Sequence, residues 1–180
     1  MRAARSERQA ERMQERDVAA EYRINIRSLL ERLNERKSIS LQICAETAAL
    51  YGLHFAELPQ MDGLLENRAG VLMLTYTLRC VLLCACDRCL AETRQEIDEQ
   101  FTHVIVTETA SEQNDAEYLL APDAVLDLAE TAMTDLRLSL PTKTLCRSDC
   151  LGLCPVCGKN RNEGECGCAE GAVTFSFEEE

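Results

Sequence analysis

The sequence predicts an α+β domain: an antiparallel β meander with a packed C-terminal helix and a cysteine-rich zinc-knuckle tail. Alternating apolar residues mark strands, a capped amphipathic segment follows them, and cysteines cluster at Cys80 to Leu90 and at Cys146 to Cys168. We expect three parts. Residues 1–22 form a polar helical or disordered arm, residues 23–145 form the α+β region, and residues 146–180 form a zinc-binding tail packed on it.

The strand predictions rest on a period of two in the apolar residues. SISLQIC alternates Ile39, Leu41 and Ile43 with polar residues. Two further runs flank Asn67 to Gly70, whose Asn and Gly tolerate the left-handed backbone of a hairpin turn. A third run, Ile97 to Thr107, completes the meander. The second run places one register on a single face that should be core: Leu72, Leu74, Tyr76, Leu78, Cys80, Leu82 and Cys84.

The segment DLAETAMTDLRLSLP predicts a helix with Asp127 as N-cap and Glu130 at the capping-box position, ended by Pro141. An earlier amphipathic turn is expected through Leu29, Leu30 and Leu33. By composition, TASEQNDAEYLLAP is a mobile polar loop and AVTFSF is compatible with an edge strand. The apolar face of the longer helix is wide: Leu128, Ala129, Ala132, Met133, Leu136 and Leu140.

The composition favours a cytoplasmic protein. No apolar run approaches the ~20 residues of a membrane span, and the first twenty residues are charged throughout, unlike a secretory signal. Structural disulfides do not persist in a reducing cytosol, and eleven cysteines cannot all pair. The CxxC spacings therefore indicate metal or redox chemistry rather than a disulfide framework.

A CxxC turn presents two sulfurs to one ion because the chain reverses across the intervening pair. The preferred arrangement closes a short local site with the last four cysteines, which costs little chain entropy, and leaves the other four for a second site. The alternative joins Cys86/Cys89 to Cys154/Cys157, as in a zinc ribbon. Eight cysteines are spaced to hold one or two structural zinc ions: Cys86, Cys89, Cys146, Cys150, Cys154, Cys157, Cys166 and Cys168.

No catalytic residue is predicted, because no Gly-rich phosphate loop, Ser nucleophile motif or metal-spaced carboxylate cluster occurs. His54 and His103 have no ligand-spaced neighbour, and Cys80 and Cys84 are expected to be small core hydrophobes. No role is predicted for Cys44. A thioredoxin-like CxxC opens a helix beside a βαβ unit, whereas CDRC lies between two predicted antiparallel strands. We expect no enzymatic activity.

Charge is uneven along the chain. Residues 1–37 hold ten Lys/Arg against seven Asp/Glu, whereas residues 38–180 hold nine against twenty-four. Such an acidic region disfavours direct rRNA contact, which would have to use the N-terminal arm or a local patch, because nucleic-acid affinity comes largely from Lys and Arg. A basic protein partner fits better, although acidity also serves solubility alone. No membrane partner is expected.

The tail LCRSDCLGLCPVCGKNRNEGECGC, with CDRCL and the capped helix ending at Leu140 and Pro141, resembles the YceD family of large ribosomal RNA accumulation proteins. The resemblance runs from about Ile24 to Cys168. It implies a small cytoplasmic bacterial protein that is needed for accumulation or processing of 23S rRNA in the large ribosomal subunit and that has no established catalytic activity.

The resemblance also implies that Cys86 and Cys89 belong to the part common to the family, while the tail set from Cys154 to Cys168 varies among members. Arg161 departs from the family tail, which more often has Leu there.

We therefore expect a non-catalytic ribosome biogenesis factor that binds a basic large-subunit ribosomal protein or a pre-ribosomal particle, with zinc fixing the docking surface. The alternative is a redox-sensitive zinc switch or holdase chaperone, because the closely spaced sulfurs of CACDRC can release zinc on oxidation. A zinc module that binds RNA directly is disfavoured by the charge.

Overall fold

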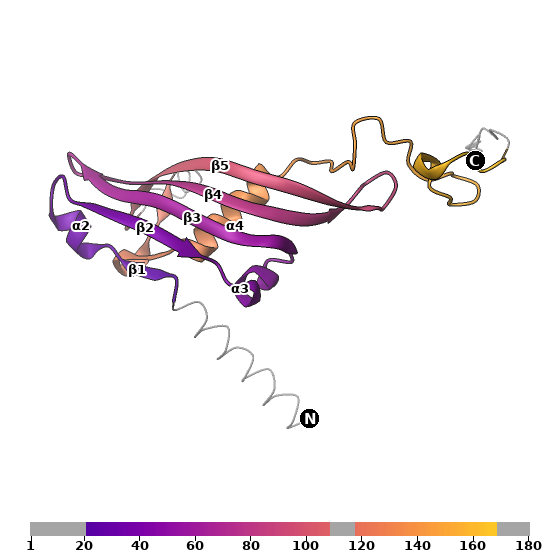
Figure 1. The fold of residues 1–180 in the computed structure, drawn as a ribbon. Coiled ribbons are helices and arrows are strands. Elements are labelled where there is room, and N and C mark those ends of the chain that lie inside the picture. The colour runs from indigo at the N-terminus through magenta and orange to yellow at the C-terminus, as the bar shows by residue number, and fades with distance from the viewer. Residues whose placement is uncertain (1–20, 109–117, 169–180) are drawn as a thin grey trace, which may run out of the picture. The chain divides into compact units, whose positions relative to one another are not determined.

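The computed structural model describes residues 21–108 and 118–168 (Figure 1). Residues 1–20 of the predicted N-terminal arm, most of the predicted polar loop and the AVTFSF segment lie outside the described residues. Tyr22, the last residue of that predicted arm, is buried and belongs to the body. The chain divides into two compact units. The body holds the described residues up to Leu83 together with Arg94–Leu140, and the cysteine-rich unit holds Cys84–Thr93 together with the chain from Pro141.

The main sheet has five strands in the order β2-β3-β4-β5-β6. β2 pairs antiparallel with β3, β3 pairs antiparallel with β4, and the short β6 adds a parallel edge to β5. The predicted antiparallel meander is thereby confirmed, while the parallel edge strand is an addition. The bounds are β2 Arg36–Gln42, β3 Phe55–Arg68, β4 Val71–Ala85, β5 Glu92–Val106 and β6 Leu119–Leu120.

The turn between β3 and β4 forms where the sequence predicts it. Ala69 and Gly70 have φ values of 53° and 93°, and the N–H of Gly70 donates to Oδ1 of Asn67 at 2.9 Å. Cys84 is only half-buried, because β4 leaves the body there. The inward register of β4 is core as predicted: Leu72, Leu74, Tyr76, Leu78, Cys80 and Leu82.

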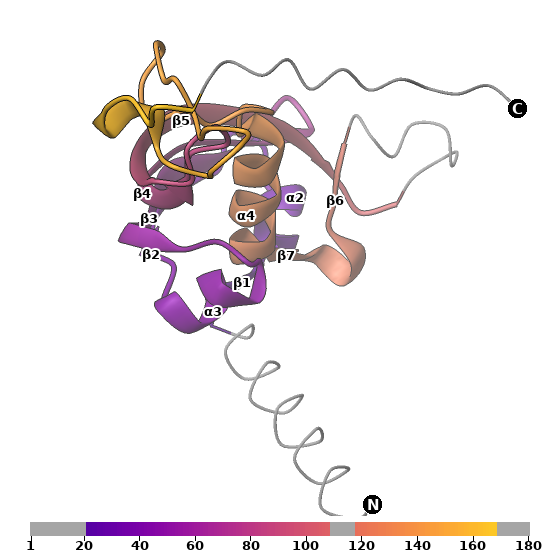
Figure 2. The ribbon, with the colours of Figure 1, turned by 90° about the vertical axis from the view of Figure 1, so that its right-hand side faces the viewer.

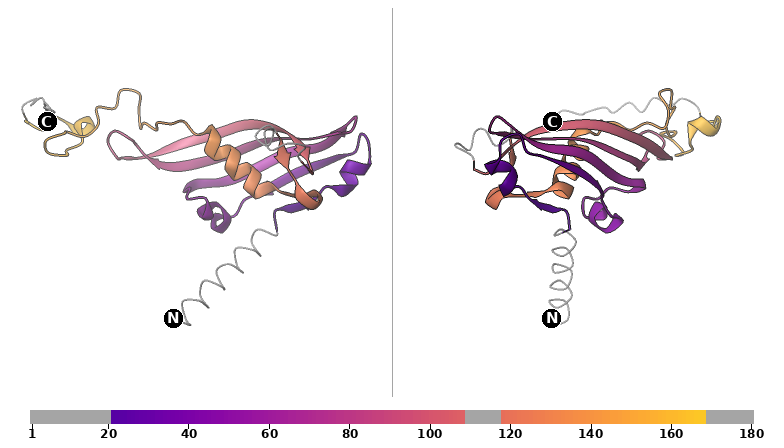
Figure 3. Two further views of the ribbon diagram at one scale, coloured as in Figure 1. Left: turned by 180° about the vertical axis from the view of Figure 1, so that it is seen from behind. Right: turned by 60° about the vertical axis from the view of Figure 1, so that its left-hand side comes forward.

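Helix α4 (Leu128–Ser139) lies across one face of the sheet (Figure 3). Its predicted cap is present, since Oδ1 of Asp127 accepts the N–H of Glu130 at 3.0 Å. The last apolar residue, Leu140, is the C-cap and precedes Pro141. The face turned toward the sheet is buried: Leu128, Ala129, Thr131, Ala132, Met133 and Leu136.

Short elements complete the body. β1 (Arg23–Asn25) pairs antiparallel with β7 (Val125–Asp127), and β6 and β7 lie beside α4 (Figure 2). The 3₁₀ turn η1 (Pro122–Ala124) joins β6 to β7, and α3 (Ala45–Leu50) occupies a stretch for which no element is predicted. None of the helices in the described residues is long and apolar enough to cross a membrane.

The predicted amphipathic turn through Leu33 is only partly right. Helix α2 (Arg27–Glu31) buries Leu29, but Leu33 is 66% exposed. The helix ends at Glu31, since Arg32 is extended with φ −117° and ψ 113°. Asn34 then takes a left-handed conformation with φ 62°, and its N–H donates to the carbonyl of Asn67 at 2.9 Å. This bond turns the backbone into β2.

Candidate metal centres

The eight predicted ligand cysteines gather in two groups within the cysteine-rich unit, and in each group the four sulfurs lie within 4.8 Å of one another. These are the two sets of the preferred arrangement, and the two CxxC pairs fall in different groups. The hairpin group is Cys86, Cys89, Cys146 and Cys150. The tail group is Cys154, Cys157, Cys166 and Cys168.

The hairpin group begins in a tight turn between β4 and β5. The N–H of Cys86 donates to the carbonyl of Ala91 at 2.8 Å, and the N–H of Leu90 donates to the carbonyl of Cys86 at 2.9 Å. Leu90 has φ 59°, a left-handed conformation that non-glycine residues rarely adopt. The turn therefore brings the sulfurs of Cys86 and Cys89 to one side.

The CPVC segment of the tail folds into the same turn. The N–H of Cys154 donates to the carbonyl of Lys159 at 2.8 Å, and the N–H of Gly158 donates to the carbonyl of Cys154 at 2.9 Å. Gly158 has φ 72° and occupies the position of Leu90 in the first turn. Two unrelated tetrapeptides thus adopt one backbone geometry that presents a pair of thiols, which is the ligand pattern of a metal knuckle.

The backbone of each turn favours ionisation of its first thiol. Hydrogen bonding from the backbone of Cys146 contributes most to lowering the pKa of Cys86 to about 6, against the opposing effect of burial. In the tail, the backbone N–H groups of Cys157 and then Val156 lower the pKa of Cys154 to about 6. A thiolate is the form of cysteine that binds metal.

One thiol in each group resists ionisation. Burial, and then the neighbouring sulfur of Cys89, raise the pKa of Cys146 to about 12. The sulfurs of Cys157 and Cys166 raise the pKa of Cys168 to about 12. Four sulfurs packed together repel one another as thiolates unless a cation neutralises them. Each group can hold one metal ion.

The groups differ in exposure. In the hairpin group, Cys86, Cys89 and Cys150 are at most 5% exposed and pack with Leu145 and Leu153. The sulfurs of Cys86 and Cys150 are 3.8 Å apart, far beyond the ~2.05 Å of a disulfide. In the tail group only Cys154 is buried, and Cys157 is exposed. The hairpin group is thus the more enclosed site.

Polar contacts outside the sulfurs hold the hairpin group together. The guanidinium of Arg88 donates to the carbonyl of Cys150 at 2.9 Å, and the N–H of Asp87 donates to the carbonyl of Thr144 at 2.9 Å. These bonds join the β4–β5 turn to the chain that carries Cys146 and Cys150. They fix two ligand pairs that lie far apart in the sequence.

Asn162 makes a polar contact that was not predicted from the sequence. Its Nδ2 donates to the sulfur of Cys150 at 3.3 Å, although Asn162 lies in the loop between two tail-group ligands. Burial alone raises the pKa of Cys150, but hydrogen bonding from Asn162, then from the backbone of Gly152, lowers it overall. The only sequence signal is an amide residue inside the loop that separates Cys157 from Cys166.

The family model for the large ribosomal RNA subunit accumulation protein YceD matches residues 74–179, more than half of the chain. The chain belongs to the YceD family. The match confirms the resemblance, although its N-terminal limit lies well after Ile24. No solved structure gives a significant match.

Curated relatives of this chain include proteins from mycobacteria. An uncharacterized protein of Mycobacterium bovis and two uncharacterized proteins of Mycobacterium tuberculosis strains are each 27% identical to this YceD family member over 103 residues. The aligned region is 54% of this chain and 49% of each relative. The chain therefore spans about half the length of the curated relatives it matches.

The other thiols are set apart from the two groups. Burial raises the pKa of Cys80 to about 11, and its side chain belongs to the core, as predicted. Cys84 is half-buried rather than a core residue. The sulfur of Cys44 lies 3.2 Å from the hydroxyl of Thr47 at the start of α3.

His103 takes part in a polar cluster inside the body. Its Nε2 lies 2.6 Å from Oδ2 of Asp135, and the hydroxyl of Tyr76 donates to the same oxygen. Gly63 lies opposite Tyr76 in the sheet, and a Cβ there would lie 2.4 Å from that of Tyr76. The cluster joins β4, β5 and α4.

The other histidine, His54, has a backbone contact: its carbonyl accepts the N–H of Leu83 at 2.8 Å.

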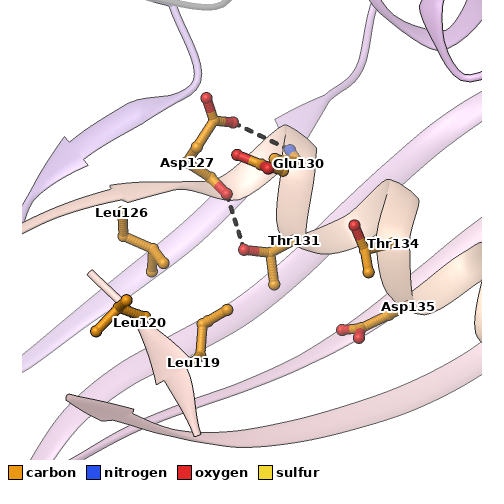
Figure 4. Close-up of a pocket in the computed structure, with 8 residues that line it drawn as sticks. All are labelled: Leu119, Leu120, Leu126, Asp127, Glu130, Thr131, Thr134 and Asp135. Carbon is orange, nitrogen blue, oxygen red and sulfur yellow. Dashed lines mark hydrogen bonds between the residues drawn. The ribbon is translucent and has the colours of Figure 1, made fainter. Parts of the chain in front are cut away.

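A pocket of about 270 Å³ opens beside α4 in the body (Figure 4). Its apolar wall comes from β6 and β7, and its polar wall comes from the helix and its cap. Asp127 also forms an ion pair with Arg23 at 3.3 Å. The lining carries three carboxylates and no basic side chain: Leu119, Leu120, Leu126, Asp127, Glu130, Thr131, Thr134 and Asp135.

Proposed function

We propose that this YceD family member is a non-catalytic ribosome biogenesis factor with structural zinc in both cysteine groups. It supports accumulation and processing of 23S rRNA in the large subunit by binding a basic ribosomal protein or a pre-ribosomal particle. The observation that carries the proposal is the pair of complete four-sulfur sets. A catalytic zinc site keeps one position open for water or substrate, whereas four thiolates fill a tetrahedron.

Zinc is the metal that fits the sulfur geometry best. A tetrahedron with Zn–S bonds of about 2.3 Å has sulfur–sulfur edges of about 3.8 Å. Two sulfur–sulfur distances in the hairpin group are close to this value: 3.8 Å between Cys86 and Cys150, and 3.6 Å between Cys89 and Cys146. All-sulfur tetrahedral sites suit zinc or iron–sulfur chemistry, and the paired knuckles favour zinc.

Metal analysis of the purified protein tests this assignment. Two zinc ions per chain are expected by inductively coupled plasma mass spectrometry. The double variant Cys166→Ser/Cys168→Ser should lower the content to one, whereas Cys44→Ser should leave it at two, since Cys44 lies in neither group. A colourless protein without zinc, or iron with a visible absorption band, would contradict the zinc assignment.

The distribution of charge supports a basic partner and suggests where it binds. Residues 21–83 hold seven Lys/Arg against seven Asp/Glu, so this part of the body is balanced. Residues 94–108 and 118–140 each hold one basic against four acidic residues. Within residues 21–108 and 118–168, the excess of negative charge therefore lies in two acidic stretches, 94–108 on β5 and 118–140 with α4. A Lys- or Arg-rich surface would be attracted to these stretches.

A pull-down from bacterial lysate tests the partner, with RNase-treated and untreated halves analysed by mass spectrometry and rRNA sequencing. We expect a basic large-subunit protein to remain after RNase treatment. The triple variant Glu96→Gln/Glu99→Gln/Glu130→Gln removes exposed charge from the two acidic stretches and should weaken this capture. Glu57→Gln, an exposed carboxylate in the balanced part, is the matched control.

Two outcomes would overturn the partner assignment. Loss of every large-subunit component after RNase treatment would show that contact is made through RNA. Equal capture by the triple variant and by Glu57→Gln would show that the two acidic stretches do not bind the partner.

One observation favours a second function, a redox-sensitive zinc switch or holdase. Cys157 is exposed, so the tail group is open to oxidants that the hairpin group excludes. Mild peroxide should then release one zinc ion per chain and leave the second bound. Retention of both ions at peroxide concentrations that oxidise free thiols would contradict this function.

A further inference from the structure

We propose that Asn162 couples the two metal sites, so that an ion in the tail group positions the amide that donates a hydrogen bond to the sulfur of Cys150 in the hairpin group. This inference rests on the proposed metal binding and deepens it. The two groups become one coupled pair rather than two independent structural ions.

The amide of Asn162 is held in one orientation. Its Oδ1 accepts the N–H of Leu151 and a guanidinium N–H of Arg147, each at 2.8 Å. The opposite end, Nδ2, donates to the sulfur of Cys150 at 3.3 Å and to Oδ1 of Asn160 at 2.8 Å. Because both ends have fixed partners, an N–H of Asn162 is directed at the sulfur.

The position of this amide depends on the tail loop. Asn162 lies between Cys157 and Cys166 in the 3₁₀ turn η2 (Arg161–Glu163), which has no buried residue. Oδ1 of Asn160 caps this turn by accepting the N–H of Asn162 at 3.1 Å. The turn has no buried side chain and is held by hydrogen bonds, so an ion shared by Cys157 and Cys166 stabilises it further by closing the loop.

A second connection links the groups through the three residues between Cys150 and Cys154. The N–H of Leu153 donates to the carbonyl of Arg88 in the hairpin knuckle at 3.0 Å. The carbonyl of Gly152 accepts the N–H of Arg161 in the tail loop at 2.9 Å. Gly152 has φ 74°, and a Cβ there would lie 3.0 Å from the carbonyl oxygen of Arg88. These backbone hydrogen bonds and the side chain of Asn162 thus connect the hairpin group to the tail loop.

Hydrogen bonds from outside the ligand set tune metal affinity, because they stabilise the ligand in its ionised form. Loss of such a partner costs about 10- to 100-fold in metal affinity. Coupling between two binding sites is reciprocal, so the hairpin ion must strengthen binding at the tail group by the same factor. Asn162 is therefore a positioning residue for the metal site.

The substitution Asn162→Asp isolates the donor. The new side chain keeps an oxygen for Leu151 and Arg147 but replaces the amide that faces the sulfur of Cys150 with a second oxygen. Asn162→Ala removes both the oxygen acceptor and the N–H donor. Arg161→Ala is the control from the same turn, since the Arg161 side chain is exposed and forms no hydrogen bond or ion pair within the described residues.

The experiment measures Zn²⁺ and Co²⁺ affinity of the full chain by competition with a chelator, with far-UV circular dichroism as a check on folding. Asn162→Asp should weaken binding at the hairpin group about 10- to 100-fold and shift its thiolate-to-cobalt absorption band, a signature that a purely structural change leaves in place. Arg161→Ala should match the wild type. Disabling the tail group with Cys166→Ser/Cys168→Ser should weaken the hairpin group by a similar factor.

The decisive measurement is the metal affinity of the protein that carries both sets of substitutions. If Asn162 carries the coupling, adding Asn162→Asp to Cys166→Ser/Cys168→Ser produces little further loss. Full additivity, or an Asn162→Asp protein that binds like Arg161→Ala, would overturn the coupling. A wild-type chain that binds two ions independently would contradict this inference alone, whereas a wild-type chain that binds no metal would contradict the proposed function.

Discussion

The body and the cysteine-rich unit are held together by different forces. The body buries large apolar side chains such as Leu78, Met133 and Leu136 between the sheet and α4. The buried cluster described in the cysteine-rich unit consists of Cys86, Cys89 and Cys150, with Leu145, Cys146 and Leu153 packed against it. One region therefore uses the hydrophobic effect, while the other has a core made of candidate metal ligands.

The two units of this chain should therefore be stabilised by different interactions. The body should fold without metal, because apolar burial stabilises it. The cysteine-rich unit should not, because its core consists of thiols that repel one another once ionised. Substitutions and metal removal should therefore act on one unit and leave the other unchanged.

Metal removal should have the largest effect. Structural zinc contributes on the order of 10–16 kcal/mol to folding of small zinc domains, so a chelator should unfold the cysteine-rich unit. Hydrogen exchange should then lose protection in residues 84–93 and 141–168 and keep it in β3 and α4. Cys150→Ser should act in the same direction, whereas Cys44→Ser should not. Unchanged protection in the cysteine-rich unit would mean that metal does not hold it together.

A core truncation should affect only the body. Leu136 is fully buried in α4, so Leu136→Ala should lower the free energy of unfolding by about 2–5 kcal/mol in urea titrations. Leu138→Ala is the matched control, since Leu138 is 80% exposed on the same helix and should change stability by less than about 0.5 kcal/mol. Metal content should stay the same in both variants. A loss of metal in Leu136→Ala would show that the units depend on one another.

The polar cluster of the body should show in the pH dependence of stability. Burial, and then the hydrogen bond with Asp135, raise the pKa of Tyr76 above its usual 10.0, so folding favours the neutral phenol. This contribution is present below pH 10 and is lost as the pH rises above that value. Tyr76→Phe should reduce the decline above pH 10 and cost about 1–3 kcal/mol near neutral pH. Equal declines in both proteins by urea titration would contradict this.

The smallest predicted effect is a gain in the stability of the cysteine-rich unit. Leu90 is 67% exposed and has φ 59°, which costs an L-residue roughly 1–2 kcal/mol. Leu90→Gly should therefore raise the stability of the metal-bound unit by up to about 1 kcal/mol, after the entropic cost of glycine. Hydrogen exchange of the β4–β5 turn measures it.

Leu151→Gly is the control for this gain. Leu151 is 57% exposed in the same unit, and its φ is not positive, so glycine there should only destabilise. Loss of stability in both variants would mean that the Leu90 side chain makes a contact that outweighs its backbone strain.

Elements with a local signal could be predicted from the sequence. The β3–β4 turn needs only Asn67 and Gly70, and the start of α4 needs only Asp127, because each acts on backbone a few residues away. Where a local pattern meets a distant partner, prediction fails. Leu33 fits the helical period of α2, but the chain is already extended at Arg32, and the bond from Asn34 to Asn67 leads it into β2.

The sequence by itself determined the meander, the capped helix, the two CxxC turns and membership of the YceD family, because short-range spacing encodes each of them. Only the tertiary structure decided which ligand pairs meet. Loop-closure entropy favoured a local tail site but left the zinc-ribbon alternative open. The fold decides between them by bringing Cys86 and Cys89 to Cys146 and Cys150 across more than fifty residues. The amide of Asn162 against a sulfur from the other group has the same origin, since contacts between distant segments depend on the fold that brings them together.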